Sequence, residues 1–348
     1  MTLPAIDQKF LVEFLTNLLK TMSPTGFAEM AIDYTRQNLA AFPELDLVQT
    51  RKGALLATLS GQRQDRPRAL TAHVDTLGAM VKEIKSNGRL KLSQIGGYSW
   101  NVIEGEGCTV CTSDDQRIRG SILLEKASAH VFGVEVSESK RDEKTMEVRL
   151  DIRTTSPEET RAAGIQVGDF VCFDPRVEVV NGFIRSRHLD DKAGVAVLVT
   201  AVKAMHEAGL KPVQKSYLLI SNFEEVGHGA ATGIPAEVTE LLVVDMAAVG
   251  QGQTSDEFHT TLCVKDSQGP YDYGMSQHLR QLAVNENIPY QVDIYPHYGS
   301  DGGAFWRAGG DAAEALIGPG VDASHNYERT HLDGLVATTQ WVLAYLLN

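Results

Sequence analysis

The chain has 348 residues, of which 43% are apolar and 22% charged, an ordinary composition for a globular protein with about two domains. Its formal net charge of −13 argues against nucleic acid or an anionic membrane as a partner. Asp7, Lys9, Glu13 and Lys20 interrupt any signal-peptide core, and no apolar run approaches the ~18 residues that span a bilayer. We therefore expect a cytoplasmic protein.

The N-terminal part of the chain alternates between helical and strand-like patterns. Apolar residues recur at helical spacing in residues 7–22, and the same period resumes in residues 27–42. Short apolar runs of strand length follow at residues 53–61 and 68–75. The pattern predicts two amphipathic helices and then two strands.

The sequence pattern changes near residue 78, and the new pattern continues to about residue 175. Short β-like runs are separated there by Gly, Asp, Asn and Ser, a spacing typical of a small β barrel or sandwich. Within this segment, residues 156–164 predict a short helix with Ser156 as its N-cap and Pro157 at its first position.

Helices and strands alternate again in the C-terminal half. Helices are predicted at 190–209, 271–288 and 332–348, and strands at 216–223, 240–247 and 312–319. This alternation predicts an α/β fold: a mixed, largely parallel sheet flanked by helices, with an inserted small β-barrel domain. We expect residues 1–77 and 178–348 to form the sheet domain and residues 78–177 the inserted β-rich domain.

The predicted strands of the sheet domain end in histidines and carboxylates. The residues concerned are His73, Asp75, Glu224, Glu225, Asp245 and His325, while Asp190 and Asp191 open a helix. Any one of these alone is weak evidence, since a strand-end Asp is usually a turn or cap residue. Ligands of open α/β sheets, however, bind outside the carboxyl ends of the strands, so these side chains should converge.

The chemistry of this set suits metal ions. Two histidines and three carboxylates can hold a pair of zinc-like ions about 3.5–4 Å apart with one carboxylate bridging them. Imidazole and carboxylate favour Zn, with Co or Mn as substitutes. One further acid can hold an imidazole in place, and another can act as general base on water.

Several motifs together resemble a known family. They are TAHVDTLGAMVKEI, RHLDDKAGVA, SNFEEVGHGA, LLVVDMA, YGSDGGA and GVDASHNYERTHLDGL. In order and spacing they resemble the di-metal tetrahedral aminopeptidases, also called glutamyl or deblocking aminopeptidases, over nearly the whole chain. The resemblance implies a zinc-peptidase type of fold, with the β-rich insert as a dimerisation domain and a particle that is often a tetrahedral dodecamer.

The resemblance also implies a set of metal ligands. Asp190 would bridge the two metals. His73 and Asp245 would each contribute to one metal site, and Glu225 and His325 would complete the other.

The resemblance assigns the remaining acids to catalysis. Asp75 would orient His73, and Glu224 would be the general base. Because neighbours in an extended segment project in different directions, we expect only one of the two glutamates to bind metal while the other faces the attacking water. By motif position, the resemblance implies that Glu225 is the ligand and Glu224 the base.

The segment around the last ligand departs from the commoner family pattern. That pattern has an Arg-Tyr pair before the ligand and a His-Ser-Pro run after it, whereas residues 320–331 are GVDASHNYERTH. This departure bears on the substrate pocket. SPTGF, SRHLDDKAG and SHNYERTH look more like a subgroup linked to the osmoprotectant N-acetylglutaminylglutamine amide.

Other polar residues near the motifs have two interpretations. His188, His228 and His331 could contact substrate or serve as structural donors and caps. Asp301 could pair with a substrate amine or shape a turn. We expect structural roles for the remaining histidines, which are His130, His206, His259, His278 and His297.

The leading hypothesis is a metallo-aminopeptidase that removes N-terminal residues of short peptides with metal-activated water and a glutamate base. One alternative is a dedicated amidohydrolase for a small N-acylated dipeptide amide, and another is a metal-binding scaffold without activity. Short peptides or such an amide are the expected substrates. A homo-oligomer, from dimer to dodecamer, is the expected assembly.

Overall fold

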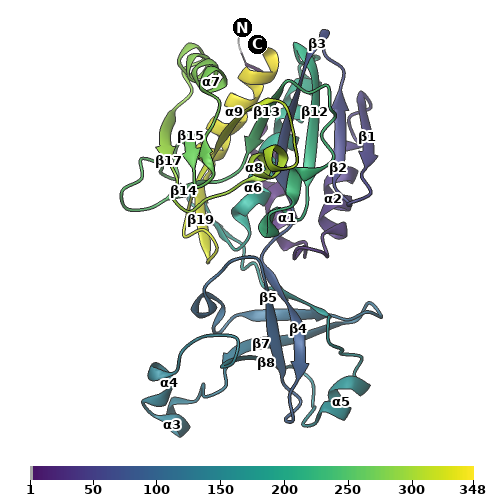
Figure 1. Ribbon diagram of the computed structural model, residues 1–348, viewed down its shortest axis with the longest axis vertical. Helices are drawn as coiled ribbons and strands as arrows, with labels where there is room; N and C mark the ends of the chain where they lie inside the picture. Colours follow the sequence, from purple (N-terminus) through teal and green to yellow (C-terminus); the bar gives the residue numbers. More distant parts are fainter. Residues whose placement is uncertain (1–2) are drawn as a thin grey trace. The chain divides into compact units, whose positions relative to one another are not determined.

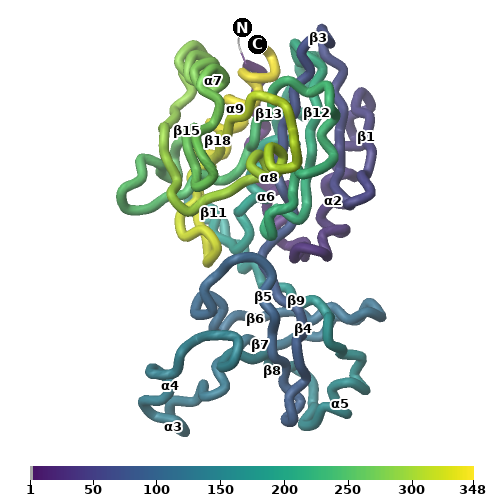
Figure 2. Tube along the Cα trace, viewed as in Figure 1, coloured from purple at the N-terminus to yellow at the C-terminus, as the bar shows by residue number. Residues whose placement is uncertain are grey.

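The structure is a computed structural model that describes residues 3–348 and falls into two compact units. Among the described residues, one unit comprises residues 3–75 and 176–348, and the other comprises Thr76–Pro175 (Figure 1, Figure 2). Each unit encloses its own cluster of buried apolar side chains. Within the described residues, no helix is both long enough and apolar enough to cross a membrane.

A large mixed sheet forms the centre of the first unit. Its central parallel strands are, in spatial order, β12 (Gln214–Ser221), β3 (Arg63–His73), β13 (Glu240–Val244) and β18 (Ala313–Asp322). Leu70 of β3 lies opposite Leu218 on one side and Leu242 on the other. Because both faces of a parallel sheet are covered, these strands are nearly continuous apolar runs.

Shorter strands extend this sheet, mostly by antiparallel pairing. On the β12 side these are β2 (Leu55–Leu59) and β1 (Leu45–Gln49). On the β18 side the path continues through β19 (Glu328–His331), β11 (Phe183–Ser186) and β10 (Glu178–Val180). Next to β18 the sheet adds β14 (Ala247–Val249), β15 (Thr260–Asp266), β16 (Gly269–Pro270) and β17 (Tyr290–Ile294).

The two faces of the sheet pack against different partners. Alternate side chains of a strand point to opposite faces, so Leu70 and Ala72 join one core while Ala69 joins another. The helices that contribute to the first core are α1 (Gln8–Lys20), α2 (Glu29–Leu39), α6 (Leu189–Glu207), α7 (Tyr273–Asn285) and α9 (Leu332–Leu347). The second face carries the short helix α8 (Asp301–Arg307), whose Phe305 packs against that core.

Helix α1 shows how local sequence sets these elements. The Asp7 side chain accepts a hydrogen bond from the Phe10 N–H at 3.0 Å, an N-cap that satisfies one of the free donors of the first turn. Leu11, Leu15 and Leu18 recur at helical spacing and are fully buried. The helices expected from periodicity in residues 7–22 and 27–42 are therefore confirmed.

The second unit is built on a closed β barrel. The barrel strands are, in order around it, β4 (Gly78–Ile84), β5 (Leu90–Ile95), β8 (Met146–Leu150), β7 (Arg117–Leu124), β6 (Gly107–Cys111) and β9 (Phe170–Phe173). Pairing of β9 with β4 closes the barrel, which removes exposed strand edges. The predicted fold class, an α/β fold with a largely parallel sheet and an inserted small β barrel, is confirmed.

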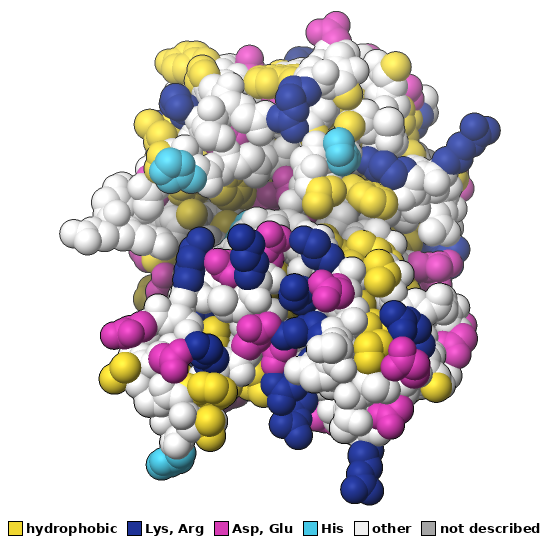
Figure 3. Space-filling view, turned by 60° about the horizontal axis from the view of Figure 1, so that its bottom comes forward, with side chains coloured by type: hydrophobic (Ala, Val, Ile, Leu, Met, Phe, Trp, Pro, Cys, Tyr) yellow, Lys and Arg dark blue, Asp and Glu magenta, His cyan; other side chains and the backbone are white. Residues whose placement is uncertain are grey.

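Short helices lie in the connections between the barrel strands, and charged side chains lie on the surface of this unit. The helices are η1 (Trp100–Ile103), α3 (Ala129–Phe132), α4 (Glu135–Glu138) and α5 (Pro157–Ala162). As predicted, the Ser156 side chain caps α5 by accepting the Glu159 N–H. In Figure 3, side chains of both charges are interspersed with scattered hydrophobic ones over this unit.

Candidate metal centre

The site lies in the first unit, where several elements end or begin. Strand β3 ends at His73, β13 ends one residue before Asp245, and helix α6 carries Asp190 in its first turn. A 3-10 turn, η2 (Glu224–Val226), follows β12, and His325 lies in the turn after β18. The peptide bond between Asp190 and Asp191 is cis. Sequence positions far apart are thus placed around one point.

Two groups of side chains there have the geometry of metal ligands. In one, single ligand atoms of His73, Asp190 and Asp245 all lie within 4.8 Å of one another. In the other, Asp190, Glu225 and His325 meet the same limit. The two groups share Asp190 and together contain the ligands that the family resemblance implies.

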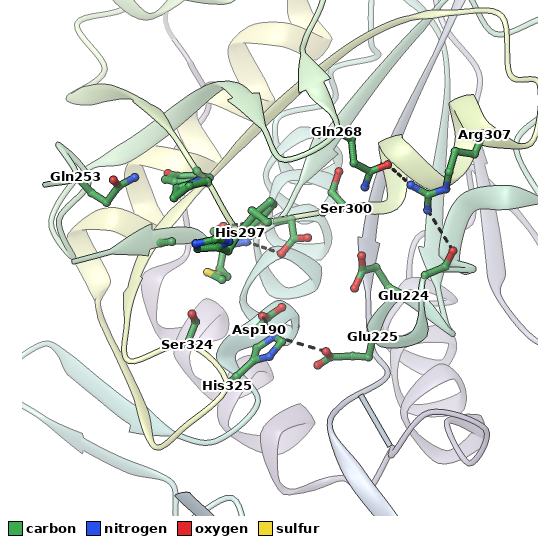
Figure 4. Close-up of a pocket in the computed structure, with 18 of the residues that line it drawn as sticks. Asp190, Glu224, Glu225, Gln253, Gln268, His297, Ser300, Arg307, Ser324 and His325 are labelled. Carbon is green, nitrogen blue, oxygen red and sulfur yellow. Dashed lines mark hydrogen bonds and ion pairs between the residues drawn. The ribbon is translucent and has the colours of Figure 1, made fainter. Parts of the chain in front are cut away.

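The shared carboxylate presents a different oxygen to each group. Asp190 Oδ1 lies 3.2 Å from His73 Nε2, and Asp190 Oδ2 lies 3.2 Å from His325 Nε2. His325 Nε2 is also 3.6 Å from a carboxylate oxygen of Glu225, the pair joined by a dashed line in Figure 4. One carboxylate between two ligand groups is the arrangement found in two-metal sites.

The orientation of His73 leaves a lone pair for a metal. Its Nδ1 lies 2.9 Å from the main-chain carbonyl oxygen of Asp75. A carbonyl oxygen can only accept, so Nδ1 must carry the proton and donate it. Nε2 is the other ring nitrogen; it faces Asp190, and its lone pair is available to a metal ion once it carries no proton.

The side chain of Asp75 lies beside His73 and also makes contacts that the motifs did not predict. Its carboxylate oxygen is 3.6 Å from His73 Nδ1, farther than its own carbonyl oxygen. The carboxylate instead accepts hydrogen bonds from the Thr25 hydroxyl at 2.6 Å and from the main-chain N–H groups of Glu224 at 3.1 Å and Glu225 at 3.4 Å. Asp75 therefore holds the imidazole through its main chain and the glutamate turn through its side chain.

The two adjacent glutamates are not in an extended segment, so that part of the expectation was wrong. Phe223 has a φ of 65° and turns the chain into the 3-10 turn that contains both glutamates. Their carboxylates nevertheless diverge. One oxygen of Glu224 lies 3.7 Å from His73 Nε2, whereas one oxygen of Glu225 lies 3.6 Å from His325 Nε2.

The carboxylates of the site lie close together, and this crowding shifts their pKa values. Burial, reinforced by neighbouring carboxylates, raises the pKa of Glu224 and of Glu225 well above the usual range and that of Asp245 to about 7. At Asp190 the effect of burial is outweighed by hydrogen bonds from His325 and His73, so the pKa of this carboxyl is lowered. Buried acids of this kind are costly unless they are paired or bind a metal. The imidazole and carboxylate donors fit divalent ions of the zinc type.

Two further buried acids, Asp191 and Glu328, support the site, and neither was assigned a role from the motifs. Asp191 accepts the main-chain N–H of His73 at 3.3 Å. Glu328 accepts main-chain N–H groups on both sides of the centre, including that of His325 at 3.0 Å. The only signal for Glu328 in the sequence is its position three residues after His325.

The candidate metal centre opens into a cavity of about 620 Å³, within the range of small-molecule sites. Besides the acids and His325, it is lined by polar residues that include Gln251, Gln253, Gln268, His297, Ser300, Arg307 and Ser324. In Figure 4, Gln253 lies across the cavity from Arg307, which donates to the Gln268 side chain and to the Gly227 carbonyl. His297, for which a structural role is expected, also lies on this wall.

The other histidines near the motifs are not among the described residues that line this cavity. His188 is buried and immediately precedes α6 with a φ of 73°. His331 caps α9 by accepting the Asp333 N–H at 3.1 Å. His228 is exposed, and its carbonyl accepts from Lys52 at 2.6 Å.

Asp301, which could have paired with a substrate amine, is a buried structural acceptor. Its carboxylate accepts hydrogen bonds from the Thr71 hydroxyl at 2.6 Å, the Ser221 hydroxyl at 2.5 Å and the Ala230 N–H at 2.8 Å. It thereby joins strands β3 and β12 to helix α8.

Comparison with known proteins agrees with this geometry. The family model of the M42 glutamyl aminopeptidases matches residues 53–340. YhfE of Bacillus subtilis, a candidate aminopeptidase, is 46% identical over 336 residues, which are 96% of each chain.

Solved structures show the same fold. The TET aminopeptidase of a marine sediment archaeon (Thaumarchaeota) superposes with a TM-score of 0.86 at 20% identity over 97% of this chain and 96% of its own. The TET1 peptidase of Pyrococcus horikoshii, which can assemble into a tetrahedron or an octahedral shell, superposes with a TM-score of 0.85 at 21% identity, covering 97% and 99% of the two chains. The family inferred from the motifs is confirmed: the chain belongs to the M42 glutamyl aminopeptidase family of metallo-aminopeptidases.

Proposed function

We propose that this enzyme removes the N-terminal residue of short peptides with the help of two divalent ions. His73, Asp190 and Asp245 would hold one ion, and Asp190, Glu225 and His325 the other. Zinc suits these donors, and cobalt or manganese could replace it. The observation that carries the proposal is the sharing of Asp190, whose two oxygens each lie 3.2 Å from a different histidine.

Glu224, the neighbour of the proposed ligand Glu225, is placed to accept and donate protons. Once bound, the ions supply Lewis acidity, which polarises the scissile carbonyl and makes a water molecule easier to deprotonate. Glu224 accepts a proton from the attacking water at its carboxylate and later delivers a proton to the leaving amine. Its carboxylate borders the cavity and lies on the His73 side of the centre, which supports this role.

A second candidate is an amidohydrolase for a small N-acylated dipeptide amide. The observation that favours it is the cavity wall, where Gln251, Gln253 and Gln268 offer neutral amide groups. Such groups can exchange hydrogen bonds with carboxamides of a substrate. Ser324, from the segment that departs from the common family pattern, also lines the cavity.

A substrate panel on protein of known metal content separates these candidates. The panel pairs dipeptides that have a free α-amine with their N-acetyl forms, each as the acid and as the amide, in the presence of Zn²⁺, Co²⁺ or Mn²⁺. We expect turnover of the free-amine peptides and little turnover of the N-acetyl forms. Turnover confined to N-acetyl dipeptide amides would favour the second candidate. No turnover by fully loaded protein would indicate a scaffold.

A further inference from the structure

Glu328, in strand β19, connects two parts of the metal centre. Its side chain is almost completely buried, with the residue 2% exposed. One carboxylate oxygen accepts main-chain N–H groups of Leu189 at 2.6 Å and Asp190 at 3.3 Å. The other oxygen accepts the main-chain N–H of His325 at 3.0 Å. A single carboxylate thus bridges the segment that carries Asp190 and the turn that carries His325.

The turn that carries His325 needs support of this kind. His325 has a φ of 61° and Ala323 a φ of 59°, in the left-handed region that residues other than glycine adopt only at an energetic cost. Such conformations persist where the surrounding structure holds them. The hydrogen bond from the His325 N–H to Glu328 fixes the main chain at the point from which the imidazole projects toward Asp190.

We propose that Glu328 is a positioning residue that sets the separation between Asp190 and His325 and thereby the affinity of the Asp190–Glu225–His325 group for its metal ion. This inference rests on the proposed function, because it assumes that this group holds an ion. Groups that hold metal ligands in place typically change metal affinity or activity by about 10- to 100-fold when they are replaced. His73 and Asp245 belong to the other ligand group, which should be affected less.

Glu314, in strand β18, provides a matched control. It is also a glutamate of the first unit and is 0% exposed. Among the described residues, neither of its carboxylate oxygens has a hydrogen-bond partner. Its carboxylate instead packs directly against Gly302. A Cβ atom added to that glycine would lie 1.4 Å from one carboxylate oxygen of Glu314. The two glutamates therefore match in type and burial and differ in their contacts with the centre.

The test compares Glu328→Gln with Glu314→Gln in the full chain. Glutamine keeps the size of glutamate but has one accepting oxygen, and its NH₂ group would face a main-chain N–H that needs an acceptor. Each protein is stripped of metal, and Zn²⁺ binding is followed by calorimetry and by metal analysis after equilibrium dialysis. Far-UV circular dichroism and urea unfolding monitor the fold.

The expected result is selective weakening of one ion. At a Zn²⁺ concentration that just saturates the parent chain, E328Q should retain one ion, and the affinity for the second should fall by about 10- to 100-fold. E314Q should bind as the parent chain does. Excess Zn²⁺ should restore most of the activity of E328Q, which a general loss of structure would not allow.

Parental stoichiometry and affinity in a folded E328Q would overturn the proposal. If E328Q does not fold, Glu328→Asp replaces it, since aspartate keeps the charge but shortens its reach by one methylene. Weakened binding of the second ion in E328D supports the proposal, and unchanged binding overturns it.

These outcomes are distinct from failure of the proposed function. A parent chain that binds two ions but hydrolyses no peptide would contradict that function while leaving the role of Glu328 measurable. A parent chain that binds no divalent ion would contradict both, because the inference assumes an ion at this group.

Discussion

The Asp75 carboxylate accepts the main-chain N–H of Glu224 at 3.1 Å, so the acid that follows strand β3 holds the turn that carries the glutamate pair. His73 is held separately, by the main-chain carbonyl of Asp75 at 2.9 Å. The two functions of Asp75 can therefore be separated by mutation. A change confined to its side chain should disturb the glutamates more than the imidazole.

Asp75→Asn tests this separation. Asparagine keeps the main-chain carbonyl that orients His73 but replaces one accepting oxygen with an NH₂ group beside the glutamate turn. We expect kcat to fall by about 10- to 100-fold while both ions remain bound. Steady-state kinetics combined with metal analysis on the same preparation provides the measurement. Loss of one ion, with unchanged activity per fully loaded molecule, would show that the carboxylate acts through His73 instead.

The roles proposed for Glu224 and Glu225 predict two different mutant phenotypes. Glu224→Gln keeps the size of the side chain and removes its proton acceptor, so kcat should fall by about 10²–10⁴ with metal content unchanged. Glu225→Gln removes a charged ligand, so metal content and activity should fall together. Metal analysis and rates on both variants decide between them. Metal loss in E224Q with retention in E225Q would reverse the roles, and activity in both would contradict the mechanism.

Removal of metal should destabilise the protein. The carboxylates of Glu224, Glu225 and Asp245 are crowded together, and without ions only the neighbouring histidines offset their mutual repulsion. An ion that binds only the native state adds about 2.7 kcal/mol at a free concentration 100 times its Kd. We expect chelation to lower the thermal midpoint and Zn²⁺ to restore it. An unchanged midpoint in protein proven metal-free would contradict a buried metal centre.

Glu314 predicts a pH dependence of stability away from the metal centre. Burial is the main cause that raises its pKa from an ordinary value of 4.5 to about 8. Between these values the folded chain keeps a proton that the unfolded chain releases, so the free energy of unfolding decreases as pH rises through this window. Glu314→Gln removes this contribution. It should match the parent chain near pH 5 and exceed its stability by at least about 1 kcal/mol near pH 8.5.

Urea unfolding at the two pH values, with equal metal loading, provides the measurement. If the free energy of unfolding of E314Q differs from that of the parent chain by the same amount at both pH values, Glu314 is ionised in the folded protein.

Assembly through the barrel unit remains a prediction. Val131 in α3 and Val134 beside α4 are 72% and 69% exposed in the single chain. Closed symmetry favours an even-numbered homo-oligomer, most simply a dimer built through residues 76–175. Light scattering at micromolar concentration should detect it, and a monomer there would contradict the prediction.

A pair of double variants locates the interface. V131D/V134D places charges on the exposed valines of the barrel unit and should weaken assembly. V179D/V180D places the same charges on exposed valines of β10, which belongs to the other unit, and should leave assembly intact. If V179D/V180D dissociates the oligomer and V131D/V134D does not, the interface lies in the unit that contains the large sheet.

Periodicity predicted the strands that lead to the candidate site, and residue chemistry predicted which polar side chains meet there. The apolar runs that end at His73 and near Asp245 predicted strands, and the convergence of strand ends predicted one edge for their polar side chains. Ser156 followed by Pro157 correctly predicted a capped helix, because both signals are local in the sequence.

Tertiary structure alone decided how the centre is held together. The left-handed Phe223 placed the two glutamates in a 3-10 turn, and Asp75, which follows a strand far away in sequence, supplied the acceptor for that turn. Glu328 likewise received N–H groups from two segments that only the fold brings together. A buried carboxylate is stable where main-chain donors satisfy it, and those donors belong to segments whose meeting depends on the whole sheet. Residue types therefore specified the chemistry of the site, while packing of distant segments specified its supports.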